Sequence, residues 1–258
     1  MIGLCITTFN SEGYFDTLFQ SLPLDKIDHI VVVNGGKPYE KDYASIDPKI
    51  KWIQHPAVQY PSVARNDGLR YLMEKNCDHY FICEDDMIIL DHGIFNTYIN
   101  SSNVSGIQYL CHASNAWETG PRFARTPRMV VQYSENTTLN FYAHTCNEFT
   151  YRTKEMLKTV GLYDEGLRCM FDIDSLIRMC RTSICSPFWY FPDVADSDKY
   201  ITNNPDAVSR MNAEGERAAT LLPEHQRIYK KYGMGIGSIP LATPHEFVQK
   251  IKAIQPIK

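Results

Sequence analysis

The acidic triplet Glu84-Asp85-Asp86 has residue types and spacing that suit chemistry. It follows directly after the apolar run Tyr80 to Cys83, which predicts a buried strand. Residues two apart on a strand point to the same face, so Glu84 and Asp86 share one side and Asp85 takes the other. Such a pair suits Mg²⁺ or Mn²⁺, which prefers oxygen ligands and commonly binds one or two carboxylates together with phosphate oxygens. The alternative is a solvated acidic turn.

A second pair of carboxylates, Asp172 and Asp174, stands at the start of a run whose apolar residues recur at helical spacing. A carboxylate at a helix N-terminus accepts backbone N–H bonds and interacts favourably with the helix dipole, so capping is the structural interpretation of either residue. An ionised aspartate held in this way can also accept the proton of an attacking hydroxyl late in a transfer reaction. The two roles are compatible.

Two further groups carry positive charge. Arg65 and Asn66 bring a cation and an amide to a predicted helix start, a place that suits phosphate or a pyrimidine ring. A second basic stretch, Arg122, Arg125 and Arg128, contains no acidic residue. It can contact a polyanionic acceptor, although a solvated loop is the simpler interpretation.

The elements that must position these residues alternate between strands and helices over the first third of the chain. Apolar runs predict strands at Ile2 to Ile6, Ile30 to Val33, Lys51 to Gln54 and Tyr80 to Cys83. Helical spacing predicts helices from Asn10 or Ser11 to Leu22 and from about Ser62 to Lys75. This alternation is typical of a mainly parallel sheet, in which ligands bind outside the carboxyl ends of the strands. The acidic triplet therefore lies where a site is expected.

The pattern changes after residue 100. Predicted strands joined by loops follow at Gly106 to His112, Arg128 to Tyr133 and Leu139 to Ala143. Thr153 can cap a short helix that Gly161 ends, and a further helix begins near Ile173. We expect an α/β fold: a single Rossmann-like domain over residues 1–200, with a mainly parallel central sheet and helices on both faces. Residues 201–258 are expected to form a small C-terminal helical extension.

Charge and hydropathy narrow the function classes. The 26 Lys and Arg residues against 30 Asp and Glu give a net charge of -4, which provides no general reason to bind polyanions or membranes. No run approaches the roughly 18 apolar residues of a membrane span, and the start lacks the pattern of a signal peptide. The sequence thus predicts a cytoplasmic protein without an integral membrane segment. Its eight cysteines form no CxxC pair, which argues against a zinc module.

The order of these pieces resembles the family 2 glycosyltransferases of the GT-A fold, which combine a nucleotide-binding βαβ half with a more open acceptor half. The matching segments are Thr7-Thr8-Phe9-Asn10, Val31 to Gly36, Ala64-Arg65-Asn66-Asp67-Gly68, Glu84-Asp85-Asp86 as a DxD-like motif, Tyr151 to Thr153, Val160 to Glu165, and Asp172-Ile173-Asp174 as an ED-like motif. The resemblance covers about residues 2–195. It implies a nucleotide-sugar-binding half at residues 1–100 and an acceptor half at residues 101–200.

The resemblance implies an inverting glycosyltransferase that moves a sugar from a nucleotide-diphosphate sugar, expected to be a UDP-sugar, to an acceptor hydroxyl. It implies a divalent metal cofactor, Mn²⁺ or Mg²⁺. Asp172 is implied as the general base, whereas Asp174 is expected to point away and serve structure. The implied metal ligands are Asp86, Glu84 and Asp198, and the residues implied for the donor nucleotide are Thr7, Phe9, Asn34, Arg65, Asn66, Glu84 and Asp85. The acceptor is left open among a saccharide, a lipid-linked glycan and modified DNA.

Three positions depart from the family pattern. Val33 or Asn34 stands where the family has an acid that contacts the nucleoside, and Phe171 replaces the glutamate before the predicted base. The histidine of the late strand is missing, with Asp196 or Asp198 as its substitute. Two alternatives follow: a non-catalytic GT-A binding module, and the same chemistry on a hydroxymethylated DNA base, as in bacteriophage DNA glycosyltransferases. A nucleotidyltransferase is disfavoured because no glycine-rich basic loop follows the first strand.

Overall fold

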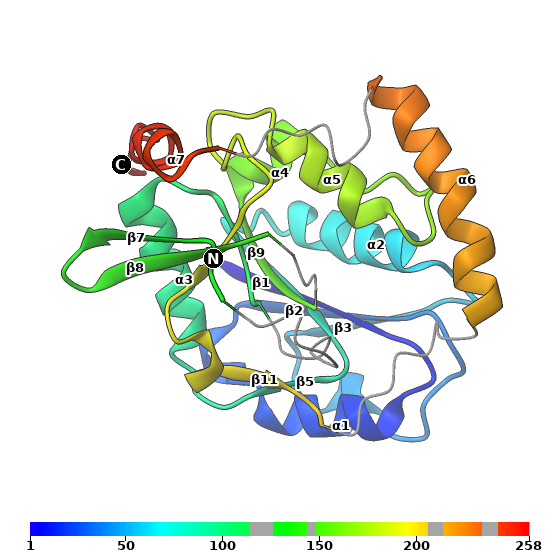
Figure 1. Cartoon of the computed structure of the whole chain (residues 1–258). Coiled ribbons are helices and arrows are strands. Elements are labelled where there is room, and N and C mark those ends of the chain that lie inside the picture. The colour runs from blue at the N-terminus through cyan, green and yellow to red at the C-terminus, as the bar shows by residue number, and fades with distance from the viewer. Residues whose placement is uncertain (114–125, 144–147, 206–213, 234–241, 258) are drawn as a thin grey trace.

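The central sheet has six strands in the order β3-β2-β1-β4-β9-β6 (Figure 1). The structure, a computed structural model, describes residues 1–113, 126–143, 148–205, 214–233 and 242–257. The strands of this sheet are β1 (Ile2–Thr8), β2 (His29–Asn34), β3 (Ile50–Gln54), β4 (His79–Glu84), β6 (Tyr109–Cys111) and β9 (Phe149–Thr153). β9 runs antiparallel to both of its neighbours, and the other pairs are parallel. The predicted mainly parallel sheet is confirmed.

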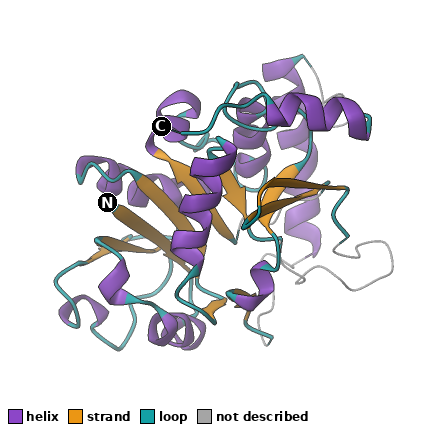
Figure 2. Cartoon of the chain, turned by 90° about the vertical axis from the view of Figure 1, so that its left-hand side faces the viewer, coloured by secondary structure: helices purple, strands orange, loops and turns teal. Residues whose placement is uncertain are grey.

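Helices cover both faces of the central sheet, and Figure 2 shows them on either side of the strands. They are α1 (Glu12–Ser21), α2 (Pro61–Glu74), α3 (Ile94–Ser105), α4 (Lys154–Val160) and α5 (Phe171–Met179). Side chains alternate along β1 and divide the core. Leu4 and Ile6 pack in one cluster with Phe15 of α1, whereas Cys5 packs in another with Leu69 of α2. The expectation of helices on both faces is confirmed.

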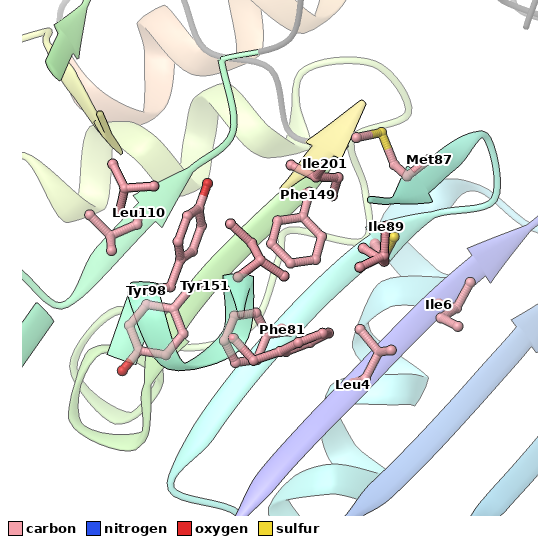
Figure 3. Close-up of a cluster of buried hydrophobic side chains, with 14 of the residues drawn as sticks. Leu4, Ile6, Phe81, Met87, Ile89, Tyr98, Leu110, Phe149, Tyr151 and Ile201 are labelled. Carbon is pink, nitrogen blue, oxygen red and sulfur yellow. The ribbon is translucent and has the colours of Figure 1, made fainter. Parts of the chain in front are cut away.

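Aromatic rings fill the core between β4, β9 and α3 (Figure 3). The ring of Phe81 on β4 lies with its centroid 5.7 Å from that of Phe149 and 5.0 Å from that of Tyr151, both on β9. Tyr98 of α3 lies 5.7 Å from Phe149. Large buried rings contribute strongly to core stability, so this cluster fixes β9 beside β4. The antiparallel pairing then brings the first residues of β9 to the carboxyl end of β4.

Two smaller sheets involve the second half of the chain. β7 (Met129–Ser134), β8 (Thr137–Tyr142) and β10 (Phe191–Val194) form an antiparallel sheet in the order β10-β8-β7, and β5 (Met87–Ile89) pairs with β11 (Ile201–Asn203). Prediction from the sequence found β7 and β8 but missed α3 and β5. The buried face of α3 begins with apolar residues but continues with Ser101, Ser102 and Ser105, so its apolar pattern stops after one turn. β5 has three residues and pairs with a strand far along the chain.

The short helix before the second carboxylate pair forms as predicted. The Thr153 hydroxyl accepts a hydrogen bond from the Met156 backbone N–H at 3.1 Å and caps α4. Gly161 follows the last residue of α4 with a φ of 77°, in the left-handed region that favours glycine. Short 3₁₀ helices lie at Leu24–Lys26 (η1), Tyr43–Ser45 (η2) and Ser197–Lys199 (η3).

The C-terminal part contains β11 followed by the helices α6 (Glu214–Tyr232) and α7 (Pro244–Lys252). Ile228 of α6 is buried in the core cluster that includes residues of α2 and α5. Phe247 of α7 lies with its ring centroid 4.8 Å from that of Phe141 on β8. Both helices thus pack on the central part of the chain (Figure 1), and the predicted domain boundaries stay a prediction. Among the helices in the described ranges, none combines the length and apolarity needed to cross a membrane.

Candidate active site

The carboxyl ends of β1, β2 and β4 meet at one edge of the central sheet, where Asp85 fastens the loop after β1. Its Oδ2 accepts hydrogen bonds from the Thr8 hydroxyl at 2.6 Å, from the Phe9 backbone N–H at 3.2 Å and from the Ser11 hydroxyl. Thr7 pairs in register with Glu84 of β4. Asp85 therefore fixes the position of Thr7 and Phe9, which are predicted to bind the donor nucleotide.

Asn34, the last residue of β2, shapes the next loop along this edge. It is fully buried, its Nδ2 donates to the Lys37 carbonyl at 2.7 Å, and its Oδ1 accepts from the Gly36 N–H at 2.9 Å. A Cβ at Gly36 would come within 2.5 Å of Asn10 Oδ1, so this position requires glycine. The turn thus lies tightly against the loop after β1. The contacts of Asn34 explain the shape of the turn, and its role toward the nucleoside stays a prediction.

Glu84 and Arg65 form an ion pair at the boundary between this edge and the core. The Arg65 side chain is 1% exposed and that of Glu84 is 37% exposed, so the pair presents only its acidic member to ligands. The Arg65 guanidinium carbon lies 5.0 Å from the centre of the Phe171 ring and 5.8 Å from that of Tyr163. A buried charge is costly unless it is paired, and these contacts stabilise the guanidinium.

Glu148 is a residue of this edge that prediction from the sequence missed. It stands immediately before β9, its carbonyl accepts from the Glu84 N–H at 2.8 Å, and its carboxylate accepts from Asn203 Nδ2 at 3.0 Å. Loss of hydration raises the pKa of Glu84, Arg65 lowers it, and the charge of Glu148 raises it further, as do Asp86 and Asp85. No local pattern in the sequence marks Glu148, because the partner of its carboxylate, Asn203, lies far along the chain.

Asp172 is the second residue of α5 and is half-buried. Its Oδ1 accepts a hydrogen bond from the Ile173 backbone N–H at 2.8 Å, which holds the carboxylate at the helix N-terminus. Burial lowers the pKa of Arg65, whereas Glu84, Tyr163 and Asp172 raise it, with an increase as the net result. Asp172 and Glu84, from different halves of the chain, are therefore within electrostatic reach of the same buried guanidinium.

Asp174 faces away from this group and is fully buried. Its Oδ2 accepts from Arg178 Nε at 3.0 Å. Its Oδ1 accepts from Lys231 Nζ at 2.7 Å and from the Tyr232 hydroxyl at 2.6 Å. These contacts join α5 to α6, in agreement with the structural role expected for Asp174.

The structure corrects the position expected for Arg65 and Asn66. α2 begins at Pro61, so both residues lie a full turn inside the helix and are buried. Asn66 Nδ2 donates to the Tyr163 carbonyl at 2.9 Å and to Glu165 Oε1 at 2.8 Å, and its Oδ1 accepts from the Tyr163 N–H at 2.9 Å. In the described chain Asn66 thus ties α2 to the turn before α5, and its predicted contact with the donor stays a prediction.

The predicted metal ligands are only partly brought together. Glu84 and Asp86 lie at the end of β4, whereas Asp198 is exposed on η3. Within the described residues, no group of three or more His, Cys, Asp or Glu side chains is arranged to hold a metal. The strand-end set nevertheless suits a hard cation chemically, because its donors are carboxylate oxygens. Ligation by Glu84, Asp86 and Asp198 stays a prediction.

Most of the basic stretch predicted to contact a polyanionic acceptor, including Arg122 and Arg125, lies outside the described residues. Arg128 is described, and its backbone N–H donates to the Phe141 carbonyl at 2.7 Å. This contact extends the pairing of β7 with β8.

No protein-family model and no curated protein matches the chain. Solved structures do match it. A structure of S. aureus TarS (1–349) is similar with a TM-score of 0.56 and 15% identity, over 97% of this chain and 70% of that chain. A structure of S. aureus TarS gives a TM-score of 0.58 and 14% identity, over 98% of this chain and 42% of that chain. The chain has the GT-A fold.

The GT-A similarity covers nearly all of this chain but less than half of the longer TarS chain. At these identities it shows the fold alone, and membership of family 2 stays a prediction. The mannosyltransferase PcManGT from Pyrobaculum calidifontis, solved with GDP-Man and Mn²⁺, has a TM-score of 0.49 and 12% identity, over 98% of this chain and 68% of that chain. A score at that level carries no argument about this chain.

Proposed function

We propose that the chain is an inverting glycosyltransferase that transfers a sugar from a nucleotide-diphosphate sugar to an acceptor hydroxyl. The observation that carries the proposal is the buried Arg65, which interacts with Glu84 at the sheet edge and with Asp172 at the start of α5. Catalytic groups must lie close together to act on one bound substrate. Arg65 thus connects two places. One is the sheet edge, where ligands are expected to bind in such a fold, and the other is Asp172, the carboxylate that we propose accepts the proton.

The donor is proposed to bind along the carboxyl ends of β1, β2 and β4. The hydrogen bonds that Asp85 accepts from Thr8 and Phe9 hold the loop after β1 at this edge. Glu84 lies at the same edge, in register with Thr7. Glu84 and Asp86 would hold Mn²⁺ or Mg²⁺, which supplies positive charge against the diphosphate leaving group. A UDP-sugar is the donor we propose, as the family resemblance implies.

Asp172 is proposed to act as the general base. The acceptor hydroxyl gives its proton to the Asp172 carboxylate, and its oxygen forms a bond to the anomeric carbon. The bond from that carbon to the diphosphate oxygen breaks, and its electron pair leaves with the diphosphate. Attack from the face opposite the leaving group inverts the anomeric configuration. The Ile173 N–H donates to the Asp172 carboxylate and holds it at the N-terminus of α5.

The test is a panel of nucleotide sugars assayed for donor hydrolysis with Mn²⁺, followed by acceptors added one class at a time: saccharides, lipid-linked glycans and hydroxymethylated DNA. Turnover of one donor that rises with one acceptor class supports the proposal and identifies the acceptor. A chain that binds a nucleotide sugar without breaking it contradicts the proposal and favours a non-catalytic binding module.

A further inference from the structure

The chain entering α5 is held by a carboxylate from another helix. Three successive backbone N–H groups, of Arg168, Cys169 and Met170, donate to the Glu224 carboxylate at 2.5, 2.9 and 2.8 Å. Glu224 lies on α6 and is 7% exposed. Met170, the N-cap of α5, makes no side-chain cap hydrogen bond. A carboxylate more than fifty residues along the chain thus holds the three residues that lead into α5.

These hydrogen bonds form a rigid attachment. Bonds to an ionised acceptor are roughly twice as strong as bonds between neutral groups. A buried carboxylate is costly unless it is hydrogen-bonded, so Glu224 and the turn at residues 168–170 depend on each other. The negative charge also lies near the N-terminus of α5, where the helix dipole favours it. Asp172 follows two residues after the last of the three donors, so its position is tied to this turn.

α6 is attached a second time on the other side of Asp172. Lys231 Nζ and the Tyr232 hydroxyl both donate to Asp174, at 2.7 and 2.6 Å. Between the two attachments, Ile228 of α6 is fully buried. Asp172 therefore lies between two points at which α6 is hydrogen-bonded to the segment that carries it. Figure 1 shows α6 alongside the ends of α5 and α2.

We propose that Glu224 is a positioning residue for the glycosyl transfer, holding the turn before α5 so that the Asp172 carboxylate meets the acceptor hydroxyl. This inference rests on the function proposed for Asp172. Glu224 acts through the backbone of residues 168–170 and not by contact with the substrate. A misplacement of a catalytic group by about 1 Å can cost about 10²-fold in rate, so loss of the attachment should lower turnover. The donor residues at the sheet edge have their own supports, so donor binding should change little.

The experiment compares Glu224→Gln and Glu224→Asp with the neighbouring, exposed control Gln226→Ala. Glutamine keeps one acceptor oxygen and turns an amide N–H₂ toward backbone donors, whereas aspartate keeps the charge with a shorter reach. We expect turnover of Glu224→Gln to fall by about 10-fold or more, with the donor KM changed by less than about 2-fold. Hydrogen exchange at the amides of residues 168–170 should become faster. Glu224→Asp should recover part of both losses, and Gln226→Ala should match the wild type.

The outcomes separate this inference from the proposed function. Normal turnover in Glu224→Gln, with or without faster exchange at residues 168–170, overturns the positioning role alone. A loss that disappears when turnover is expressed per folded molecule, measured by thermal unfolding, also overturns it. Parallel loss of donor affinity and turnover indicates a general disturbance and counts against it. Absence of transfer by the wild-type chain with every donor overturns the proposed function and this inference together.

Discussion

The two carboxylate groups of the candidate site are positioned in different ways. At the sheet edge, Asp85 is held by Thr8, Phe9 and Ser11, all from β1 and the loop that follows it. At the start of α5, the turn before Asp172 is held by Glu224, which belongs to the C-terminal part of the chain. The first arrangement is a consequence of parallel sheet geometry, and the second depends on how α6 packs. Damage to the sheet edge should therefore impair donor and metal binding, whereas damage near α5 should impair proton transfer.

The largest effect is expected from loss of the proposed metal site at the sheet edge. Asp86→Ala removes one of two carboxylates proposed to hold the cation, and turnover should fall by about 10³-fold, because metal stabilisation of a leaving group contributes several kcal/mol. EDTA should have the same effect on the wild type, and added Mn²⁺ should reverse it. The matched control is Glu135→Ala, which removes an exposed acid in the turn between β7 and β8. Turnover that survives EDTA contradicts the metal site.

The next largest effect is expected at α5. Asp172→Asn preserves the size of the side chain and an oxygen that can accept the Ile173 N–H, but it removes the proton acceptor. Turnover should fall by at least about 10²-fold, as expected for removal of a general base. Donor affinity, measured by calorimetric titration, and the melting temperature should stay near the wild-type values. Near-normal turnover of the folded variant rules Asp172 out as the base.

The sheet edge and the start of α5 also differ in how far the sequence predicts them. The strands of the parallel sheet and the cap of α4 by Thr153 have local signals, namely apolar runs and a capping residue at the right spacing. Glu148 and Glu224 are single acids whose partners lie far along the chain, so no local pattern marks them. Asn66 was assigned to the donor from the family resemblance, and its contacts with Tyr163 and Glu165, far along the chain, had no local signal.

A smaller effect is expected from Asp85→Ala. The variant removes the single carboxylate oxygen that accepts from Thr8, Phe9 and Ser11, so the loop after β1 loses its attachment to β4. We expect the donor KM to rise by about 10-fold and the free energy of unfolding to fall by about 1–3 kcal/mol, since the hydroxyls of the buried residues Thr8 and Ser11 lose an acceptor. Turnover at saturating donor should change much less. Steady-state kinetics and chemical denaturation measure the two effects.

Asp85→Asn serves as the conservative control for that loop, because its amide oxygen can still accept hydrogen bonds, though more weakly than a carboxylate. It should lie between the wild type and Asp85→Ala in donor KM. A fall in turnover without a change in the donor KM would instead assign Asp85 to the transfer step. It would contradict the division of roles between the sheet edge and the start of α5.

The smallest effect on turnover is expected from Asp174→Asn, two residues from the proposed base. Asparagine keeps one of the two acceptor oxygens and replaces the other with an amide N–H₂. That amide would face either Arg178 or the pair Lys231 and Tyr232, depending on which oxygen is replaced. Arg178 also donates to the Leu162 carbonyl at 2.8 Å, and Lys231 to Asp164 at 3.0 Å. Because these cations keep other acceptors, we expect a loss of about 1–3 kcal/mol rather than that of an isolated buried charge.

In a chain of this size such a loss corresponds to a fall in melting temperature of about 2–4 °C for each kcal/mol. The Glu224 attachment does not involve the Asp174 side chain, so Asp172 should stay in place and turnover per folded molecule should remain within about 3-fold of the wild type. Thermal unfolding and turnover at a temperature where the variant is fully folded measure both quantities. If Asp174→Asn is folded and inactive while Asp172→Asn is active, the roles of the two aspartates are reversed, because the buried carboxylate would then be the one that the reaction needs.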